Sequence, residues 1–234
     1  IIVMPGTYGS EVNMSGKEIW LHSSAGAEVT IIDGEGTKRG IICHWWETSN
    51  TIIQGFTITN GYTDNFGGGM SNDWYTYPTL IDCIFTNNTA GQDGGGMYNR
   101  SGSSPTLINC TFENNTSLNN GGGMYNLESS PTLIDCTFTN NTAGQIGAGM
   151  HSQGSSSSPT LTACTFENNT ALDGSGGGMH SIWSSPKLTG CTFTGNTATV
   201  GGGMYNYDNS SPNLDNCIFE NNTALVGSGG GMYN

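Results

Sequence analysis

A repeat of about 27 residues is the feature that most constrains the fold of this chain. From residue 70 to the end, each repeat holds a glycine run that ends in methionine, then a proline, then a cysteine, and a phenylalanine two residues after the cysteine. Successive cysteines of this column are 26 to 28 residues apart. A self-similar unit of this length predicts a solenoid, in which each unit packs mainly on its two neighbours.

Each repeat contains three segments that are typical of short β-strands. They are a Gly-Met segment, a Pro-Thr-Leu segment and a Cys-Thr-Phe segment. No segment of the chain shows the apolar period of a helix, so we predict essentially no helix. Three strands in this length are too few for a propeller blade and fit one coil of a three-sided solenoid. The predicted fold class is therefore all-β, a parallel β-helix (β-solenoid) with about 26–27 residues and three short strands per coil.

Columns of identical residues are expected to stack inside this solenoid, each residue on its own kind. Burial of one phenylalanine per coil contributes about 2–3 kcal/mol of transfer free energy. The predicted core ladders are Cys83, Cys110, Cys136, Cys164, Cys191 and Cys217; Phe85, Phe112, Phe138, Phe166, Phe193 and Phe219; and Met97, Met124, Met150, Met179 and Met204.

The cysteines give no sign of a metal site. None forms a Cys-x-x-Cys pair, and we predict neither a metal nor another cofactor. Stacked coils place neighbouring cysteines about 4.8 Å apart, a spacing at which a disulfide is geometrically allowed. Side chains in such a column point the same way, which favours free, buried thiols. Cys43 stands outside the column, and the repeat does not explain it.

The chain is expected to form one elongated domain with two parts. Residues 1–69 are predicted to be irregular first coils, and residues 70–234 regular coils of the same solenoid. The chain opens within an apparent strand and stops in mid-repeat, so we expect a processed or truncated piece of a longer protein. Its 5 Lys and Arg against 18 Asp and Glu give a net charge of −13, which disfavours nucleic acid and anionic membranes as partners. No apolar run is long enough to insert into a bilayer.

Two sets of motifs resemble known proteins. Residues 3–8 read Val-x-Pro-Gly-x-Tyr and resemble the first coils of the pectate-lyase-like superfamily of right-handed parallel β-helices. From residue 66, Gly-rich segments and a Phe-x-x-Asn motif in each coil are similar to the GGA[ILV] and FxxN repeats of chlamydial polymorphic outer-membrane proteins and related bacterial surface proteins. Here GGGM, or GAGM once, replaces the GGA[ILV] motif. The resemblance implies a right-handed β-helix, an extracellular or cell-surface location, and adhesion.

The pectate-lyase-like superfamily also includes polysaccharide lyases and hydrolases, so catalysis has to be considered. A lyase needs a basic residue beside calcium-binding carboxylates. Arg100 has no two carboxylates at matching positions in neighbouring repeats, and the chain has no Asp-Asp pair. Uniform repeats also leave little room for the unique residues of an active site. We therefore predict no catalytic residues.

The residues that follow the methionines are the predicted binding residues. Alternation with an inward methionine directs them outward, on the glycine-lined side. Such an aromatic ladder can stack on sugar rings, or it can serve only to stiffen the sheet. Two histidines without a third ligand make a poor metal site. The candidates are Tyr98, Tyr125, His151, His180, Tyr205 and Tyr233.

Two further patterns leave alternatives open. Five Asn-x-Thr motifs are either glycosylation acceptors, if the protein is secreted by a eukaryote, or polar ladders at a turn. An aromatic-rich stretch in the first third is either a contact site or a plug at the end of the core. The motifs begin at Asn87, Asn114, Asn140, Asn168 and Asn221, and the aromatic stretch comprises Trp20, His44, Trp45 and Trp46.

The sequence thus predicts a non-enzymatic bacterial β-helix protein of the cell surface or the extracellular space, acting in adhesion or as a structural element. Its expected partners are surface glycans or other host or cell-surface molecules. Unpaired strands at the two ends also invite self-association, end to end, into fibres. The alternative is a carbohydrate-active enzyme or carbohydrate-binding module of the pectate-lyase-like superfamily.

Overall fold

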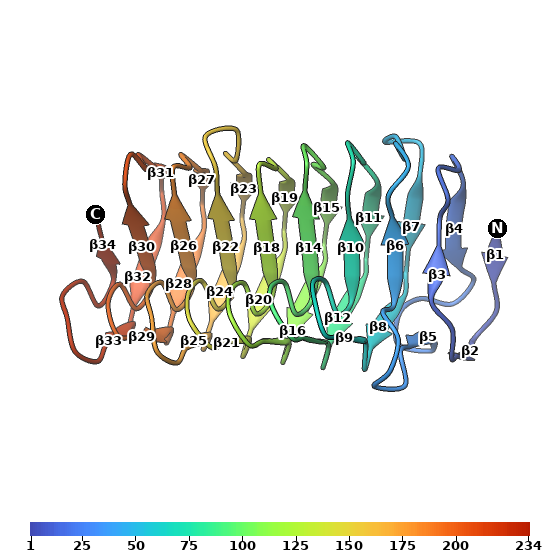
Figure 1. Cartoon of the computed structure of the whole chain (residues 1–234), viewed down its shortest axis with the longest axis horizontal. Helices are drawn as coiled ribbons and strands as arrows, with labels where there is room; N and C mark the ends of the chain where they lie inside the picture. The colour runs from blue at the N-terminus through green and yellow to red at the C-terminus, as the bar shows by residue number, and fades with distance from the viewer.

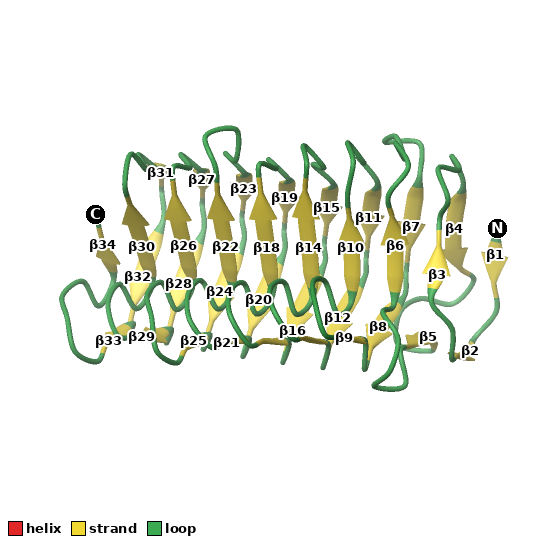
Figure 2. Ribbon diagram, in the orientation of Figure 1, coloured by secondary structure: helices red, strands yellow, loops and turns green.

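The computed structural model describes residues 1–234 and consists of 34 short β-strands, with no helix. The strands form four sheets, and every pairing between neighbouring coils is parallel (Figures 1 and 2). Three sheets have nine strands each and the fourth has seven. The prediction of an all-β solenoid with about 27 residues per coil is confirmed. The structure accordingly contains no helix long and apolar enough to cross a membrane.

Two sheets are named here after the core residue that their regular coils carry. The Leu sheet contains β1 (Ile2–Val3), β4 (Trp20–Ser23), β7 (Ile52–Gln54), β11 (Thr79–Ile81), β15 (Thr106–Ile108), β19 (Thr132–Ile134), β23 (Thr160–Thr162), β27 (Lys187–Thr189) and β31 (Asn213–Asp215). The Phe sheet contains β2 (Gly6–Tyr8), β5 (Thr30–Asp33), β8 (Thr57–Thr59), β12 (Ile84–Thr86), β16 (Thr111–Glu113), β20 (Thr137–Thr139), β24 (Thr165–Glu167), β28 (Thr192–Thr194) and β32 (Ile218–Glu220).

The other two sheets are the Met sheet, whose strands stand side by side at the front of Figure 1, and a narrow Thr sheet. The Met sheet contains β3 (Val12–Asn13), β6 (Ile41–Cys43), β10 (Met70–Asn72), β14 (Met97–Arg100), β18 (Met124–Leu127), β22 (Met150–Gln153), β26 (Met179–Ile182), β30 (Met204–Tyr207) and β34 (Met232–Tyr233). The Thr sheet contains β9 (Tyr62–Thr63), β13 (Thr89–Ala90), β17 (Thr116–Ser117), β21 (Thr142–Ala143), β25 (Thr170–Ala171), β29 (Thr197–Ala198) and β33 (Thr223–Ala224).

The Thr sheet adds a fourth strand to the three predicted for each coil. It follows the Phe strand after a turn whose first residue has a left-handed backbone, such as Asn87 with φ 56° and Asn114 with φ 55°. Asparagine tolerates this conformation better than most residues do, because its short side chain can hydrogen-bond locally. The two-residue strands carry too few apolar positions for a period-2 pattern, so the sequence did not reveal them.

The interior is filled by the repeated side chains. The phenylalanine rings of successive coils lie parallel, with centroids 4.7–4.8 Å apart from Phe85 to Phe219. The Leu, Cys and Met columns are buried in the same core up to Met204. The cysteines are free thiols, and each of the six in the repeated column donates to a carbonyl oxygen of the preceding coil, as Cys136 does to Leu107 at 3.7 Å. The core is thus apolar, with its thiols satisfied by the backbone.

A ladder of buried asparagines runs along the turn that follows the Phe strands. The Asn141 amide nitrogen Nδ2 donates to Asn169 Oδ1 and to the Phe112 carbonyl, each at 2.9 Å. Its Oδ1 accepts from the backbone N and from Nδ2 of Asn115, each at 3.0 Å. The same pattern recurs in successive coils, which explains why each coil repeats Phe-x-x-Asn: the asparagine satisfies the buried polar groups of the turn.

Candidate functional site

The predicted outer aromatic ladder exists, but four of its members are buried, and the expectation that they form an exposed face is wrong. Tyr98, Tyr125, His151 and His180 are only 1–5 % exposed, whereas Tyr233 is 39 % exposed. The rings stack face to face or tilted, with centroids 4.7–5.3 Å apart, in one column that also includes Phe66 and Tyr205. Their faces are covered by one another and are not available to a sugar.

A glycine segment of each coil, the glycine arm, folds over this ring column. The arm joins the Thr strand to the Met strand and comprises, for example, residues 91–96. Gly121 has φ 63°, and a Cβ atom there would lie 2.8 Å from the Tyr125 Cβ. A Cβ atom on Gly123 would lie 2.5 Å from the Gly149 carbonyl oxygen and 2.9 Å from the Phe138 ring. The glycine runs are therefore required for tight stacking of coils and arms, and they bury the rings.

Burial also keeps the two histidines of the column neutral. It lowers the pKa of His151 to about 4 and the pKa of His180 well below its ordinary value, and repulsion between the protonated forms of the two rings lowers the pKa of His180 further. Neither ring nitrogen of His151 has a hydrogen-bond partner. No group of three or more His, Cys, Asp or Glu side chains is placed to hold a metal ion. The histidines therefore stack as rings among tyrosines.

The ring column is interrupted near the first coils, and a cleft of about 240 Å³ lies there, which we call the Trp74 cleft. In the register of the Met sheet, Ser71 and Ile42 occupy the positions that carry tyrosine or histidine in later coils. The ring of Phe66, from the glycine arm, stacks on Tyr98 in place of a side chain at position 71, and no ring continues the column above Ile42. The cleft is lined by Arg39, Ile42, His44, Phe66, Ser71, Asp73, Trp74, Tyr98 and Arg100.

A salt bridge crosses the Trp74 cleft between neighbouring coils. Arg100 Nη2 lies 2.5 Å from Asp73 Oδ2, and the Asp73 side chain is 11 % exposed against 41 % for Arg100. The hydrogen bond to Asp73 raises the pKa of Arg100 further, so the guanidinium stays charged. The other carboxylate oxygen, Asp73 Oδ1, accepts from the Trp74 backbone N at 2.9 Å. This ion pair holds both charges beside the cleft and fixes the backbone that carries Trp74.

Trp74 lies at a turn position that has a left-handed backbone in the later coils too, as at Ser101 with φ 55° and Glu128 with φ 53°. It is 55 % exposed and has φ 60°, and the next residue, Tyr75, is 54 % exposed with φ 58°. A left-handed backbone is energetically unfavourable by about 1–2 kcal/mol for each of these bulky residues, and the turn of the solenoid imposes it here as in the later coils. The turn displays both rings to solvent instead of burying them.

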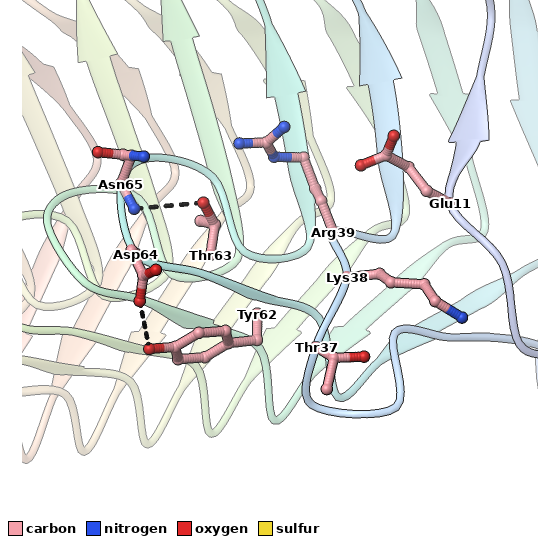
Figure 3. A pocket seen from close by; sticks show the side chains of 8 residues that line it. All are labelled: Glu11, Thr37, Lys38, Arg39, Tyr62, Thr63, Asp64 and Asn65. Carbon is pink, nitrogen blue, oxygen red and sulfur yellow. Dashed lines mark hydrogen bonds between the residues drawn. The ribbon is translucent and has the colours of Figure 1, made fainter.

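A larger cleft of about 500 Å³ adjoins the first one and shares Arg39 with it (Figure 3). The Arg39 guanidinium donates to the carbonyl oxygens of Gly67 at 2.7 Å and Phe66 at 2.8 Å, and so holds the glycine arm. Burial lowers the pKa of Arg39 from its ordinary value. The lining residues are Glu11, Thr37, Lys38, Arg39, Tyr62, Thr63, Asp64 and Asn65.

Several side chains of this larger cleft are engaged in hydrogen bonds or salt bridges. Tyr62 donates to Asp64 Oδ1 at 2.7 Å, and this hydrogen bond raises the pKa of Tyr62 (Figure 3). Lys38 forms a salt bridge of 2.7 Å with Glu35. The two clefts together contain three of the five basic residues of the chain, namely Lys38, Arg39 and Arg100. The acidic molecule therefore concentrates its few positive charges in the first coils, each close to a carboxylate or a carbonyl.

The aromatic stretch of the first third lies at the surface. Trp20, Trp45 and Trp46 are 52–65 % exposed, so they do not plug the core, and His44 lines the Trp74 cleft. Sequence reasoning missed Arg39, Asp73 and Trp74 as site residues. One signal was available: Ser71 interrupts the column of tyrosine and histidine that recurs in every later coil.

The five asparagines that begin the Asn-x-Thr motifs lie at the surface, on the left-handed turn that precedes the Thr strand. The buried ladder is formed instead by the second asparagine of each Asn-Asn-Thr sequence. Of the two readings left open, the polar ladder is therefore present but uses the neighbouring residue. Glycosylation of the first asparagine stays a prediction.

Comparison with known proteins agrees with the fold. A family model described as a right handed beta helix region matches residues 40–224, which is more than half of the chain. A search of curated proteins finds no match. The finer resemblance to the chlamydial repeats stays a prediction, whereas the parallel coils and the family match agree with each other. The chain belongs to the right-handed β-helix family.

Proposed function

We propose that this chain is a non-catalytic recognition protein of the cell surface or extracellular space, and that its first coils bind a saccharide in the Trp74 cleft. Adhesion through surface glycans is the function that such binding serves. The observation that carries the proposal is an exposed Trp74 beside the Asp73–Arg100 ion pair, at the point where the column of tyrosine and histidine is interrupted.

The chemistry of the Trp74 cleft suits a sugar. A pyranose ring has apolar faces that pack on an aromatic side chain, and hydroxyl groups around its rim that need both donors and acceptors. The cleft provides the indole of Trp74, the donors of Arg39 and Arg100, and the carboxylate of Asp73. The charges of Arg100 and Asp73 are already paired, which favours hydrogen bonding to a neutral or weakly charged ligand over ion pairing.

The regular coils support a passive role for the rest of the molecule. Their inner columns repeat without a unique residue, and their outer rings are covered by the glycine arms. A rigid rod of this kind can hold the first coils away from a surface. Asp73, the carboxylate that lines the Trp74 cleft, is held in an ion pair, which disfavours it as a general base for the enzymatic alternative.

Glycan binding by Trp74 variants tests this proposal. We expect the full chain to bind immobilised cell-surface glycans, and Trp74→Ala to lose most of this binding, because the indole offers the main apolar contact. Trp183→Ala is the matched control, since Trp183 is 44 % exposed, has φ 51° and lies in the equivalent turn of a later coil. Equal binding by both variants, with circular dichroism showing intact folds, would overturn the assignment of the site.

Self-association through the ends of the β-helix stays a prediction. Sedimentation velocity over a range of protein concentrations checks it: growth of the sedimentation coefficient with concentration supports assembly, and a constant monomer value contradicts it. The glycan-binding proposal does not depend on the outcome.

A further inference from the structure

A third cleft, of about 570 Å³, crosses the turns that follow four successive Met strands, and we call it the Tyr75 cleft. Its lining residues lie on the turns that follow β10, β14, β18 and β22. Nothing in the proposed function assigns a role to it. The lining residues are Tyr75, Tyr77, Ser101, Gly102, Ser104, Glu128 and Ser156.

Two phenol rings provide flat apolar surface in this cleft. Tyr75 is 54 % exposed and Tyr77 is 41 % exposed. Tyr75 is held by its backbone N, which donates to the Ser101 carbonyl at 3.1 Å, and by its seat on Gly102. A Cβ atom on Gly102 would lie 2.7 Å from two carbons of the Tyr75 ring, so the ring occupies space that only glycine leaves free. Both rings are therefore presented to solvent, and one of them in a fixed position.

The polar side of the cleft consists of one carboxylate and several hydroxyls. Glu128 is the only charged side chain in the lining, and its Oε2 accepts a hydrogen bond from Ser156 Oγ. Ser130 Oγ, just behind the lining, donates to the Ser156 carbonyl at 2.7 Å and helps to fix that loop. Sugar hydroxyls can donate to the carboxylate and exchange hydrogen bonds with the serines. A uronic acid would meet a like charge there, without a basic partner.

We propose that the Tyr75 cleft is a second saccharide subsite, selective for a neutral sugar. This inference rests on the proposed function of the Trp74 cleft. Trp74 lines one cleft and the adjacent Tyr75 lines the other, so one strained turn presents a ring to each. The ligand is consequently an oligosaccharide that extends from one cleft to the other, rather than a single sugar.

Titration calorimetry with linear neutral oligosaccharides of increasing length, and with oligogalacturonates as acidic probes, tests the subsite. We expect affinity to rise with the length of a neutral chain. Tyr75→Ala and Tyr77→Ala should each lower the affinity for the longest neutral chain by about tenfold, the effect of one lost aromatic contact, and leave that for the disaccharide unchanged. Tyr207→Ala is the matched control, because Tyr207 is also 54 % exposed and ends strand β30 of a later coil.

The outcomes separate the subsite from the proposed function. If Trp74→Ala weakens binding while Tyr75→Ala and Tyr77→Ala do not, the assignment of the Tyr75 cleft as a subsite is wrong, and the assignment of the Trp74 cleft is supported. If the unmodified chain binds none of these oligosaccharides, both assignments fall. The neutral selectivity would also be overturned if the chain bound oligogalacturonate more tightly than the neutral chains and Glu128→Gln left both affinities unchanged.

Discussion

The first coils and the regular coils use the same register but fill it differently. In register, Ile41 stands opposite Met70, Ile58 opposite Phe85, and Ile53 opposite Leu80, so aliphatic residues replace the repeated core residues and the core remains closed. On the outer face the replacement has the opposite effect, since Ser71 and Ile42 carry no ring, and Phe66 of the glycine arm alone extends the ring column past Tyr98 beside the cleft. Replacing the repeated residues by other apolar residues in the core conserves the fold, whereas replacing the rings of the outer face accompanies a cleft.

The comparison also explains Cys43. It is the register partner of Asn72, at the start of a buried column in which Asn72, Asn99 and Asn126 donate Nδ2 to the next side-chain oxygen. The Oδ1 of Asn72 has no partner, because the thiol below it does not satisfy this acceptor. Burial raises the pKa of Cys43 well above its ordinary value, so it behaves as a small apolar residue that closes the column.

The largest expected effect concerns the phenylalanine stack. Phe138 is fully buried between two parallel rings, so Phe138→Ala should lower the free energy of unfolding by about 4 kcal/mol. Ile58→Ala, in the same column of the first coils, should cost about 3 kcal/mol, since the smaller side chain leaves a smaller cavity. Urea unfolding measures both. A loss below about 1 kcal/mol for Phe138→Ala would show that the regular coils do not depend on the stack.

The asparagine ladder should be nearly as important. Asn141→Ala removes the side chain that donates to Asn169 and Phe112 and accepts from Asn115, so we expect a loss of about 3 kcal/mol from buried groups left without partners. The adjacent Asn140 is exposed and has φ 56°, so Asn140→Gly is the matched control and should change stability by less than about 0.5 kcal/mol. Similar melting temperatures of the two variants would contradict the ladder.

The regular coils should also be the acid-sensitive part. The pKa of His151 falls from an ordinary 6.5 to about 4 on folding, because burial disfavours the charged ring. The unfolded chain therefore takes up this proton first, and the free energy of unfolding, at its full value above pH 6.5, decreases as the pH drops toward 4. The loss from this group amounts to about 3 kcal/mol. His151→Tyr, which restores the residue of the preceding coil, should flatten the pH dependence of urea unfolding between pH 7 and pH 4. An unchanged profile would show that this imidazole takes up its proton in the folded chain.

The smallest expected effect on stability is a gain. Glycine adopts φ 60° without the cost that Trp74 bears, so Trp74→Gly should raise the free energy of unfolding by about 1 kcal/mol. The same variant should lose glycan binding, since the exposed indole is the apolar contact of the cleft. Differential scanning calorimetry and a binding assay on one preparation check both effects. A destabilised variant would mean that the indole is there for packing.

The repeat predicted most of the fold, because the inner columns recur with the period of the coil, and identical residues such as Phe85 and Phe112 had to stack. It did not predict the burial of Tyr125, because the cover comes from a glycine arm that has no apolar period of its own. It also missed the Asp73–Arg100 pair. Those residues are 27 positions apart and become neighbours only once the register of the Met sheet is known.

The central claim is that binding arises where the outer ring column is interrupted, and converting that coil to the regular pattern tests it most directly. The double variant Phe66→Asp, Ser71→Tyr gives the coil the residues that the next coil carries at these positions, Asp93 and Tyr98. We predict that its melting temperature stays within a few degrees of the original and that its affinity for neutral oligosaccharides, measured by calorimetry, is lost. Retained affinity in a folded double variant would contradict the account.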